Sequence, residues 1–153
     1  SCGRTMCRRR CRRQGLRMRC WLRGKEMTRM DKILISGLKV FAYHGVNPEE
    51  KRDGQNFILD ISAGVDLSGA CRSDRLEDTV SYAKIIKTAL RAMTESSCDL
   101  LERAAQRVAD RIFEEYPPVM ELSVLLKKPE APIRADFGYV AVSIHRKRGE
   151  PVA

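Results

Sequence analysis

Four side chains in the last four-fifths of the chain could together hold a polar ring and move protons on it. They are the carboxylates of Glu50 and Glu102, the phenol of Tyr82 and the ammonium group of Lys128. Carboxylates accept paired N–H donors, whereas a phenol and an ammonium group can exchange protons with a bound molecule. Each side chain stands in a short cluster, and the order and spacing of the clusters indicate one small-molecule site. The clusters are Tyr43-His44-Gly45 with Glu49-Glu50, Gly54-Gln55-Asn56-Phe57, Asp78-Thr79-Val80-Ser81-Tyr82, Leu100-Leu101-Glu102, Lys127-Lys128-Pro129 and Ala131-Pro132.

Lys128 follows a segment in which every second residue, from Met120 to Leu126, is apolar. Because successive side chains of a strand point to opposite faces, Lys128 continues the apolar face and Lys127 points away from it. An ammonium group on the helix-covered side, near an acidic ligand site, can shuttle protons. The structural alternative is a lysine at a strand end whose amine reaches solvent.

Glu102 also has two interpretations. Asp99 followed three residues later by Glu102 is typical of a capping box, and the helix dipole favours a glutamate in the first turn. Spacing alone favours this structural interpretation. In the functional one, the carboxylate lies beside free first-turn amides and accepts paired N–H donors from an aminopyrimidinone ring. The main chain of Leu101 or Glu102 then makes a further ring contact.

The remaining candidates have ordinary structural interpretations as well. Tyr82 could be an early helix residue that half-covers the core, and Thr79 an ordinary turn hydroxyl. Glu50 could be a solvated carboxylate in a charged loop. His44 stands in a turn and is interpreted as structural rather than catalytic.

The apolar pattern predicts four strands and two helices that would position these residues. Strict alternation or enrichment in β-branched and aromatic residues marks the strands, and apolar residues at helical spacing mark the helices. The strands are residues 32–43, 55–67, 120–126 and 140–144, and the helices are residues 81–94 and 99–115. Residues 47–54 are expected to form a charged loop between the first two strands.

The order ββααββ implies an α+β fold, a four-stranded antiparallel sheet with both helices on one face. The other face and the edges of such a sheet would be unpaired, which a monomer tolerates poorly. Association into a ring or barrel would cover both.

The positive charge of the chain is confined to its beginning. Residues 1–29 hold eleven Lys and Arg against one acid, or +10, so that the net charge of +9 leaves −1 on residues 30–153. The basic composition therefore gives no reason to expect nucleic-acid binding by the folded part. The 153 residues allow one domain with a moderate core.

We expect residues 1–30 to be a disordered basic extension, residues 31–148 to form the domain and residues 149–153 to be a flexible tail. The extension holds four of the six cysteines, without the spacing of a zinc site. It is interpreted as an upstream segment without a role in function. The alternatives are a targeting leader and a basic tail for RNA or anionic lipid.

The expected location is the cytoplasm. Arginine interrupts every apolar stretch of the first 29 residues, so neither a signal peptide nor a membrane span is expected there. Cys71 and Cys98, the cysteines of the domain, are expected to be free thiols of a reducing compartment.

Over residues 32–146 the chain resembles the dihydroneopterin aldolase family of folate biosynthesis, which belongs to the tunnelling-fold, or T-fold, superfamily. The combination of segments, in family order, carries the resemblance. These segments are Gly37-Leu38-Lys39-Val40, Tyr43-His44-Gly45, Gly54-Gln55 with Phe57, Asp78-Thr79-Val80-Ser81-Tyr82, Leu100-Leu101-Glu102-Arg103 and Lys128-Pro129 through Ala131-Pro132-Ile133.

The resemblance implies a role for each candidate. Glu102 would anchor the amino group and adjacent ring nitrogen of a pterin, helped by the Leu101 main chain. Lys128 would be the main acid/base group, and Glu50 would lie near the hydroxylated side chain of the substrate or an ordered water. From a neighbouring subunit, Thr79 and Val80 would contact the same pterin and Tyr82 would assist proton transfer. The implied assembly is a homo-octamer of two stacked tetrameric rings.

The implied reaction is the retro-aldol cleavage of 7,8-dihydroneopterin into 6-hydroxymethyl-7,8-dihydropterin and glycolaldehyde. The protonated C=N bond of the ring accepts the electrons of the broken carbon–carbon bond, so no cofactor, metal or Schiff base is expected. Two alternatives stay open. One is an epimerase that acts on dihydroneopterin or its triphosphate on the same scaffold. The other is a non-catalytic protein that binds through its basic extension, with contacts that weaken in salt.

Overall fold

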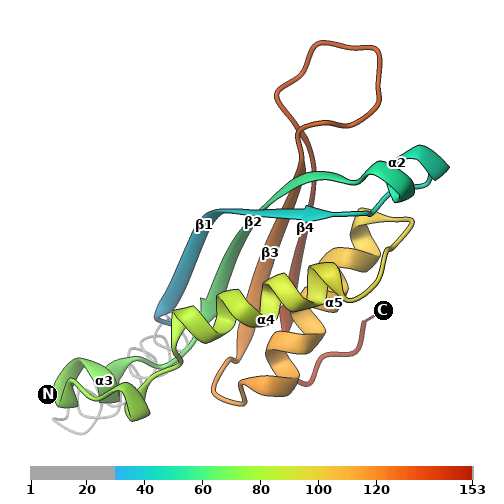
Figure 1. Ribbon diagram of the computed structural model, residues 1–153. Helices are drawn as coiled ribbons and strands as arrows, with labels where there is room; N and C mark the ends of the chain where they lie inside the picture. The colour runs from blue at the N-terminus through green and yellow to red at the C-terminus, as the bar shows by residue number, and fades with distance from the viewer. Residues whose placement is uncertain (1–29, 153) are drawn as a thin grey trace, which may run out of the picture. The chain divides into compact units, whose positions relative to one another are not determined.

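The computed structural model describes residues 30–152, which form a sheet covered on one face by two helices (Figure 1). The sheet has the order β1-β2-β3-β4, and each neighbouring pair is antiparallel. The strands are β1 (Lys32–Ala42), β2 (Gln55–Gly64), β3 (Glu121–Lys128) and β4 (Val140–Lys147), and the long helices are α4 (Tyr82–Thr94) and α5 (Leu101–Glu115). The predicted α+β class and ββααββ order are confirmed.

The core lies between the helices and one face of the sheet. Phe57, Leu59 and Ile61, at alternate positions of β2, are almost completely buried. Both helices are amphipathic, and α4 packs on β1 whereas α5 packs on β3 and β4. Each fully buried side chain of this size contributes about 1.5–3 kcal/mol, so this layer supplies much of the stability.

The open face of the sheet carries a bulge in β1. The register with β2 shifts between Ile35 and Leu38, and Gly37 has a φ of 69°, which favours glycine. Asp60, opposite on β2, accepts the Gly37 N–H at 2.6 Å and pairs with the Lys127 ammonium at 2.6 Å. The Lys127 hydrogen bond, followed by the Gly37 amide, holds the pKa of Asp60 below its usual value.

The segment expected to be a charged loop contains a helix. Residues 47–54 include α2 (Pro48–Asp53), because proline suits a first helical turn and the acidic and basic residues fall where the helix dipole favours them. Two further short segments, α3 (Ser68–Ser73) and the 3-10 helix η1 (Leu76–Asp78), follow β2 and were not expected.

The start of the second long helix also differs from expectation. Helix α5 begins at Leu101 with Leu100 as its N-cap. The Asp99 carboxylate pairs with Lys51 on α2. The predicted capping box of Asp99 with Glu102 is therefore wrong, because the side chain of Asp99 is engaged with a different element.

The ends of the strands shift by a few residues from the predicted ones, as Gly64 ends β2 and Lys147 ends β4. Most of the predicted extension, residues 1–29, lies outside the described residues. Within residues 30–152, no helix is both long enough and apolar enough to cross a membrane.

Candidate active site

The side chains of Glu50 and Lys128 form an ion pair that is nearly closed to solvent. Their side chains are 9% and 11% exposed. Lys128 follows Leu122, Val124 and Leu126 on the buried face of β3, as the alternation predicted. Glu50 comes from α2, so the pair joins the connection between β1 and β2 to the far end of β3.

Three donors surround the Glu50 carboxylate. The Lys128 ammonium and the Gln55 amide, at 3.2 Å, both donate to Oε1, and the Asn47 main-chain N–H donates to Oε2 at 3.2 Å. Burial alone would raise the pKa of Glu50, but these hydrogen bonds outweigh it and the pKa lies below its usual value. The carboxylate is therefore held in its ionised form. Glu50 was expected to be solvated in a loop, but its side chain is largely shielded from solvent.

Gly45 makes room for this carboxylate. Its φ of 157° is positive, and a Cβ atom at this position would overlap the side chain of Glu50. Only glycine permits the approach without displacing the carboxylate. The Gly45 N–H also donates to the Cys98 carbonyl at 2.9 Å, which ties this turn to the segment between α4 and α5.

His44 is buried and joins the same two segments. Its Nδ1 accepts the Cys98 N–H at 2.9 Å, and its ring packs edge-on against Phe57 at 5.5 Å between centroids. Burial lowers the pKa of His44, so the imidazole is neutral, although the Met93 carbonyl opposes this shift. Within residues 30–152, Nε2 makes no hydrogen bond of good geometry, to Met93 or elsewhere. This arrangement agrees with the structural interpretation of His44.

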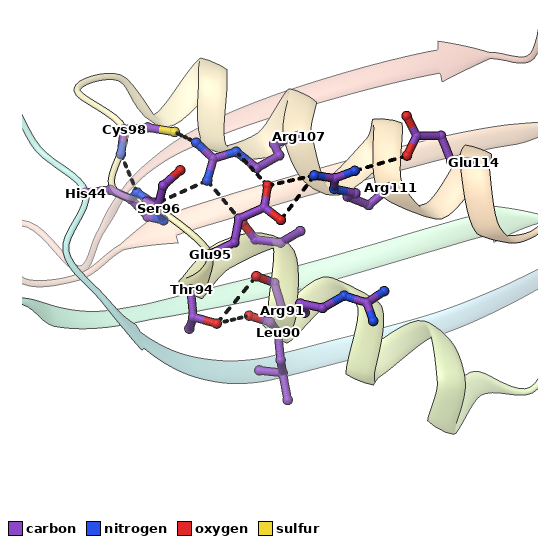
Figure 2. A network of polar contacts seen from close by, with 11 residues as sticks. His44, Leu90, Arg91, Thr94, Glu95, Ser96, Cys98, Arg107, Arg111 and Glu114 are labelled. Carbon is purple, nitrogen blue, oxygen red and sulfur yellow. Dashed lines mark hydrogen bonds and ion pairs between the residues drawn. The ribbon is translucent and has the colours of Figure 1, made fainter.

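Arg107 on α5 stabilises the turn that holds His44 (Figure 2). Its guanidinium donates to the Ser96 carbonyl at 2.9 Å and to the Cys98 sulfur. It also lies 3.6 Å from the Glu95 carboxylate, and its side chain is 13% exposed. The end of α4, the turn and α5 are thereby held together beside the Glu50–Lys128 pair.

Glu102 and Leu101 lie at the same end of the fold. They are the first two residues of α5, and the ion pair of Asp99 with Lys51 places this helix start beside α2. Glu102 is exposed, so its carboxylate and the first-turn amides of α5 are accessible to a ligand.

Thr79, Val80 and Tyr82 lie at the other end of α4. Tyr82 begins this helix and is 67% exposed, and the 13 residues of α4 span about 20 Å before the turn at Cys98. Figure 1 shows the start of α4 near α3, away from α2. One chain therefore brings Glu50, Lys128, Glu102 and Leu101 together but leaves the Tyr82 segment apart. Val80 is 6% exposed in its own core, so only its main chain is available to a ligand.

The sequence placed Gln55 in one of the site clusters but indicated no role of its own for it, and it gave no signal for the contact of Gly45 with Glu50. Gln55 is 7% exposed, and a buried glutamine in an otherwise apolar strand face was the available signal. Within residues 30–152, no group of three His, Cys, Asp or Glu side chains is arranged to hold a metal ion.

Comparison with known proteins places the chain among enzymes of one kind. The family model "FolB: Dihydroneopterin aldolase" matches residues 33–145. The curated dihydroneopterin aldolase of Methylorubrum extorquens is 41% identical over 123 residues, which cover 80% of this chain and 95% of the relative. Dihydroneopterin aldolase 1 of Arabidopsis thaliana is 38% identical over 128 residues, which cover 83% and 88%.

A solved structure shows the same architecture. The crystal structure of E. coli dihydroneopterin aldolase in complex with neopterin matches with a TM-score of 0.71 and 32% sequence identity. The match covers 76% of this chain and 99% of that one.

Proposed function

The chain belongs to the dihydroneopterin aldolase family, and from this premise we propose that it cleaves 7,8-dihydroneopterin with Lys128 and Glu50 as its central acid/base pair. Members of this family are lyases of folate biosynthesis with the T-fold. The products are 6-hydroxymethyl-7,8-dihydropterin and glycolaldehyde. The observation that carries the proposal is the nearly closed ion pair, which places a proton-carrying group at the end of the fold where α5 begins.

Glu102 anchors the pterin ring in this proposal. Its carboxylate accepts hydrogen bonds from the amino group and the adjacent ring nitrogen, and the Leu101 main chain makes a further ring contact. The exposure of Glu102 in the first turn of α5 supports this role, because a carboxylate there is free to bind a ligand.

Lys128 moves the protons. In its ammonium form Lys128 first donates a proton to the nitrogen of the ring C=N bond and becomes a neutral amine. This amine then takes a proton from the second hydroxyl of the substrate side chain, and the carbon–carbon bond breaks as that hydroxyl becomes the carbonyl of glycolaldehyde. The electrons pass into the protonated C=N bond, the re-formed Lys128 ammonium protonates the enol-like carbon, and the ring nitrogen returns its proton to the amine. The donors around Glu50 keep it ionised, so Glu50 orients the Lys128 amine between these steps.

A second copy of the chain completes the site. Tyr82, Thr79 and the Val80 main chain cannot reach the pair in their own chain because the length of α4 separates them. We expect a neighbouring subunit to supply them, with the Tyr82 phenol assisting proton transfer. The uncovered sheet face and its edges support association into rings, for which we propose two stacked tetramers.

The proposed location is the cytoplasm. Cys71 is exposed and Cys98 is buried, and both are free thiols. Free thiols suit a reducing compartment.

The proposal is tested by anaerobic incubation of the purified protein with 7,8-dihydroneopterin, followed by chromatography of the pterins and trapping of glycolaldehyde. We expect both products together, and we expect Lys128→Ala and Glu102→Ala to lose them. Formation of the side-chain epimer alone would assign the reaction to the epimerase. If neither product nor epimer forms, the catalytic proposal fails for this substrate.

A further inference from the structure

Gln55 lies inside the fold next to the proposed acid/base pair. It is the first residue of β2 and pairs with Ala42 of β1. Its side chain shares the helix-covered face with Phe57, and the residue is 7% exposed. A polar amide on this otherwise apolar face requires hydrogen-bond partners at both of its ends.

Only one end of this amide has a partner. Nε2 donates to Oε1 of Glu50 at 3.2 Å, whereas the Gln55 Oε1 atom is buried without a partner among residues 30–152. Rotating the amide by half a turn would place its carbonyl oxygen against the Glu50 carboxylate, so the bond to Glu50 decides which end is free. A buried acceptor without a donor is rare in native proteins, and here it lies beside the groups that would act on a ligand.

We propose that Oε1 of Gln55 accepts a hydrogen bond from a hydroxyl of the bound substrate's side chain. The inference rests on the proposed function, because a dihydroneopterin side chain brings hydroxyl donors next to Lys128. The Lys128 ammonium already donates to Glu50, and among residues 30–152 the His44 Nε2 atom, which also has no partner, makes no hydrogen bond to Gln55. Gln55 thus positions the side chain while Glu102 holds the ring. A water molecule could donate the same kind of O–H hydrogen bond to Gln55 Oε1, so the experiment must distinguish a substrate hydroxyl from water.

The test compares two ligands that differ only in this side chain. Titration calorimetry would measure the Kd of neopterin and of pterin without a side chain for the native protein and for Gln55→Met, which keeps the volume but removes the acceptor. Losing one neutral hydrogen bond weakens neopterin binding about fivefold to tenfold, and the binding of pterin stays unchanged. The matched control is Asn56→Met, because Asn56 is the next residue and faces outward. We expect no effect of Asn56→Met on either ligand.

Equal weakening of both ligands, or of neither, by Gln55→Met would overturn the inference. If native protein binds neither pterin, the proposed function itself fails, which is a distinct result. A crystal structure of the native protein with neopterin would show whether a substrate hydroxyl or a water molecule donates to Gln55. This experiment does not require the variant to fold. A side-chain hydroxyl oxygen at hydrogen-bond distance from Gln55 Oε1 supports the proposal. A water molecule there in the complex contradicts it.

Discussion

At the scale of single residues, Glu50 illustrates how one carboxylate can support both local structure and chemistry. Its Oε2 accepts the amide of Asn47, the N-cap of α2, while its Oε1 accepts the ammonium of Lys128. Helix formation thus orients the carboxylate before any ligand arrives. In turn, the ionised carboxylate holds the lysine amine in one position, which is the condition for directed proton transfer.

Replacing Lys128 by methionine should abolish turnover and also destabilise the protein. The variant loses the proton-carrying group, for which we expect at least about a 100-fold lower kcat. It also leaves the Glu50 carboxylate nearly buried without its cation, at a cost of about 3 kcal/mol. Steady-state kinetics and urea unfolding would measure the two effects. The matched control is Lys127→Met on the opposite face of β3, which should keep its kcat because Lys127 contacts Asp60 instead. Equal losses of kcat in both variants would contradict the assignment.

The lowered pKa of Glu50 predicts how stability depends on pH. A carboxyl group with a lower pKa in the folded than in the unfolded state contributes stability above its usual value of 4.5. This contribution is lost as pH falls through the folded pKa. Native protein should therefore exceed Glu50→Gln in unfolding free energy at pH 7, and the difference should shrink as the pH falls below 4.5. Urea unfolding at several pH values would show this trend. Glu49→Gln, an exposed neighbour on α2, should show no such trend, and a constant difference for Glu50→Gln would refute the explanation.

At the scale of elements, the bulge of β1 depends on a carboxylate from the next strand. Asp60→Ala removes the acceptor of the Gly37 amide and the partner of Lys127, so we expect a loss of about 1–2 kcal/mol in unfolding free energy. Turnover per folded site should remain, because Asp60 points away from the helices. Ser62→Ala, two residues further along the same face, is the control and should be neutral. A loss of turnover in folded Asp60→Ala would show that the bulge also affects the site.

The order of the long elements could be predicted from the sequence because periodicity reports burial directly. The alternation of β2 and the apolar stripes of α4 and α5 each reflect one buried face. Short elements were harder to predict. Helix α2 has only six residues and no buried residue, so its amphipathic signal is absent. The start of α5 was misplaced because Asp99 can cap a helix or pair with a distant lysine, and only tertiary structure decides between the two.

The candidate site, like the fold, could be predicted from the sequence only in part. Alternation along β3 was enough to place Lys128 on the buried face, which the structure confirms. The exposure of Glu50 was misjudged because its three donors come from Asn47, Gln55 and Lys128, and the last lies 78 positions away in the sequence. No local pattern reports a contact between such distant segments. The roles of all these residues in catalysis remain predictions.

At the scale of the whole molecule, the proposed site residues divide between the two ends of α4. Glu50, Lys128 and Glu102 gather where α4 ends and α5 begins, whereas Tyr82 stands where α4 begins. A site that needs both groups must be shared between two copies. The edges of the sheet give the chain a physical reason to associate, because an isolated antiparallel sheet leaves unpaired backbone groups on its outer strands β1 and β4.

Sharing of the site predicts that two inactive variants restore activity together. Tyr82→Phe lacks the phenol and Lys128→Ala lacks the amine, so each alone should form only defective sites. In mixed oligomers refolded from equal amounts, a Tyr82 from a Lys128→Ala chain can meet a Lys128 from a Tyr82→Phe chain. Random assembly would make about one site in four complete, and up to about a quarter of native turnover should return. The recovered turnover is measured by comparing the mixture before and after joint refolding. Each variant refolded alone is the control. If the mixture stays as inactive as its components while both variants assemble normally, Tyr82 and Lys128 do not meet across subunits. The length of α4 would then exclude Tyr82 from the site altogether.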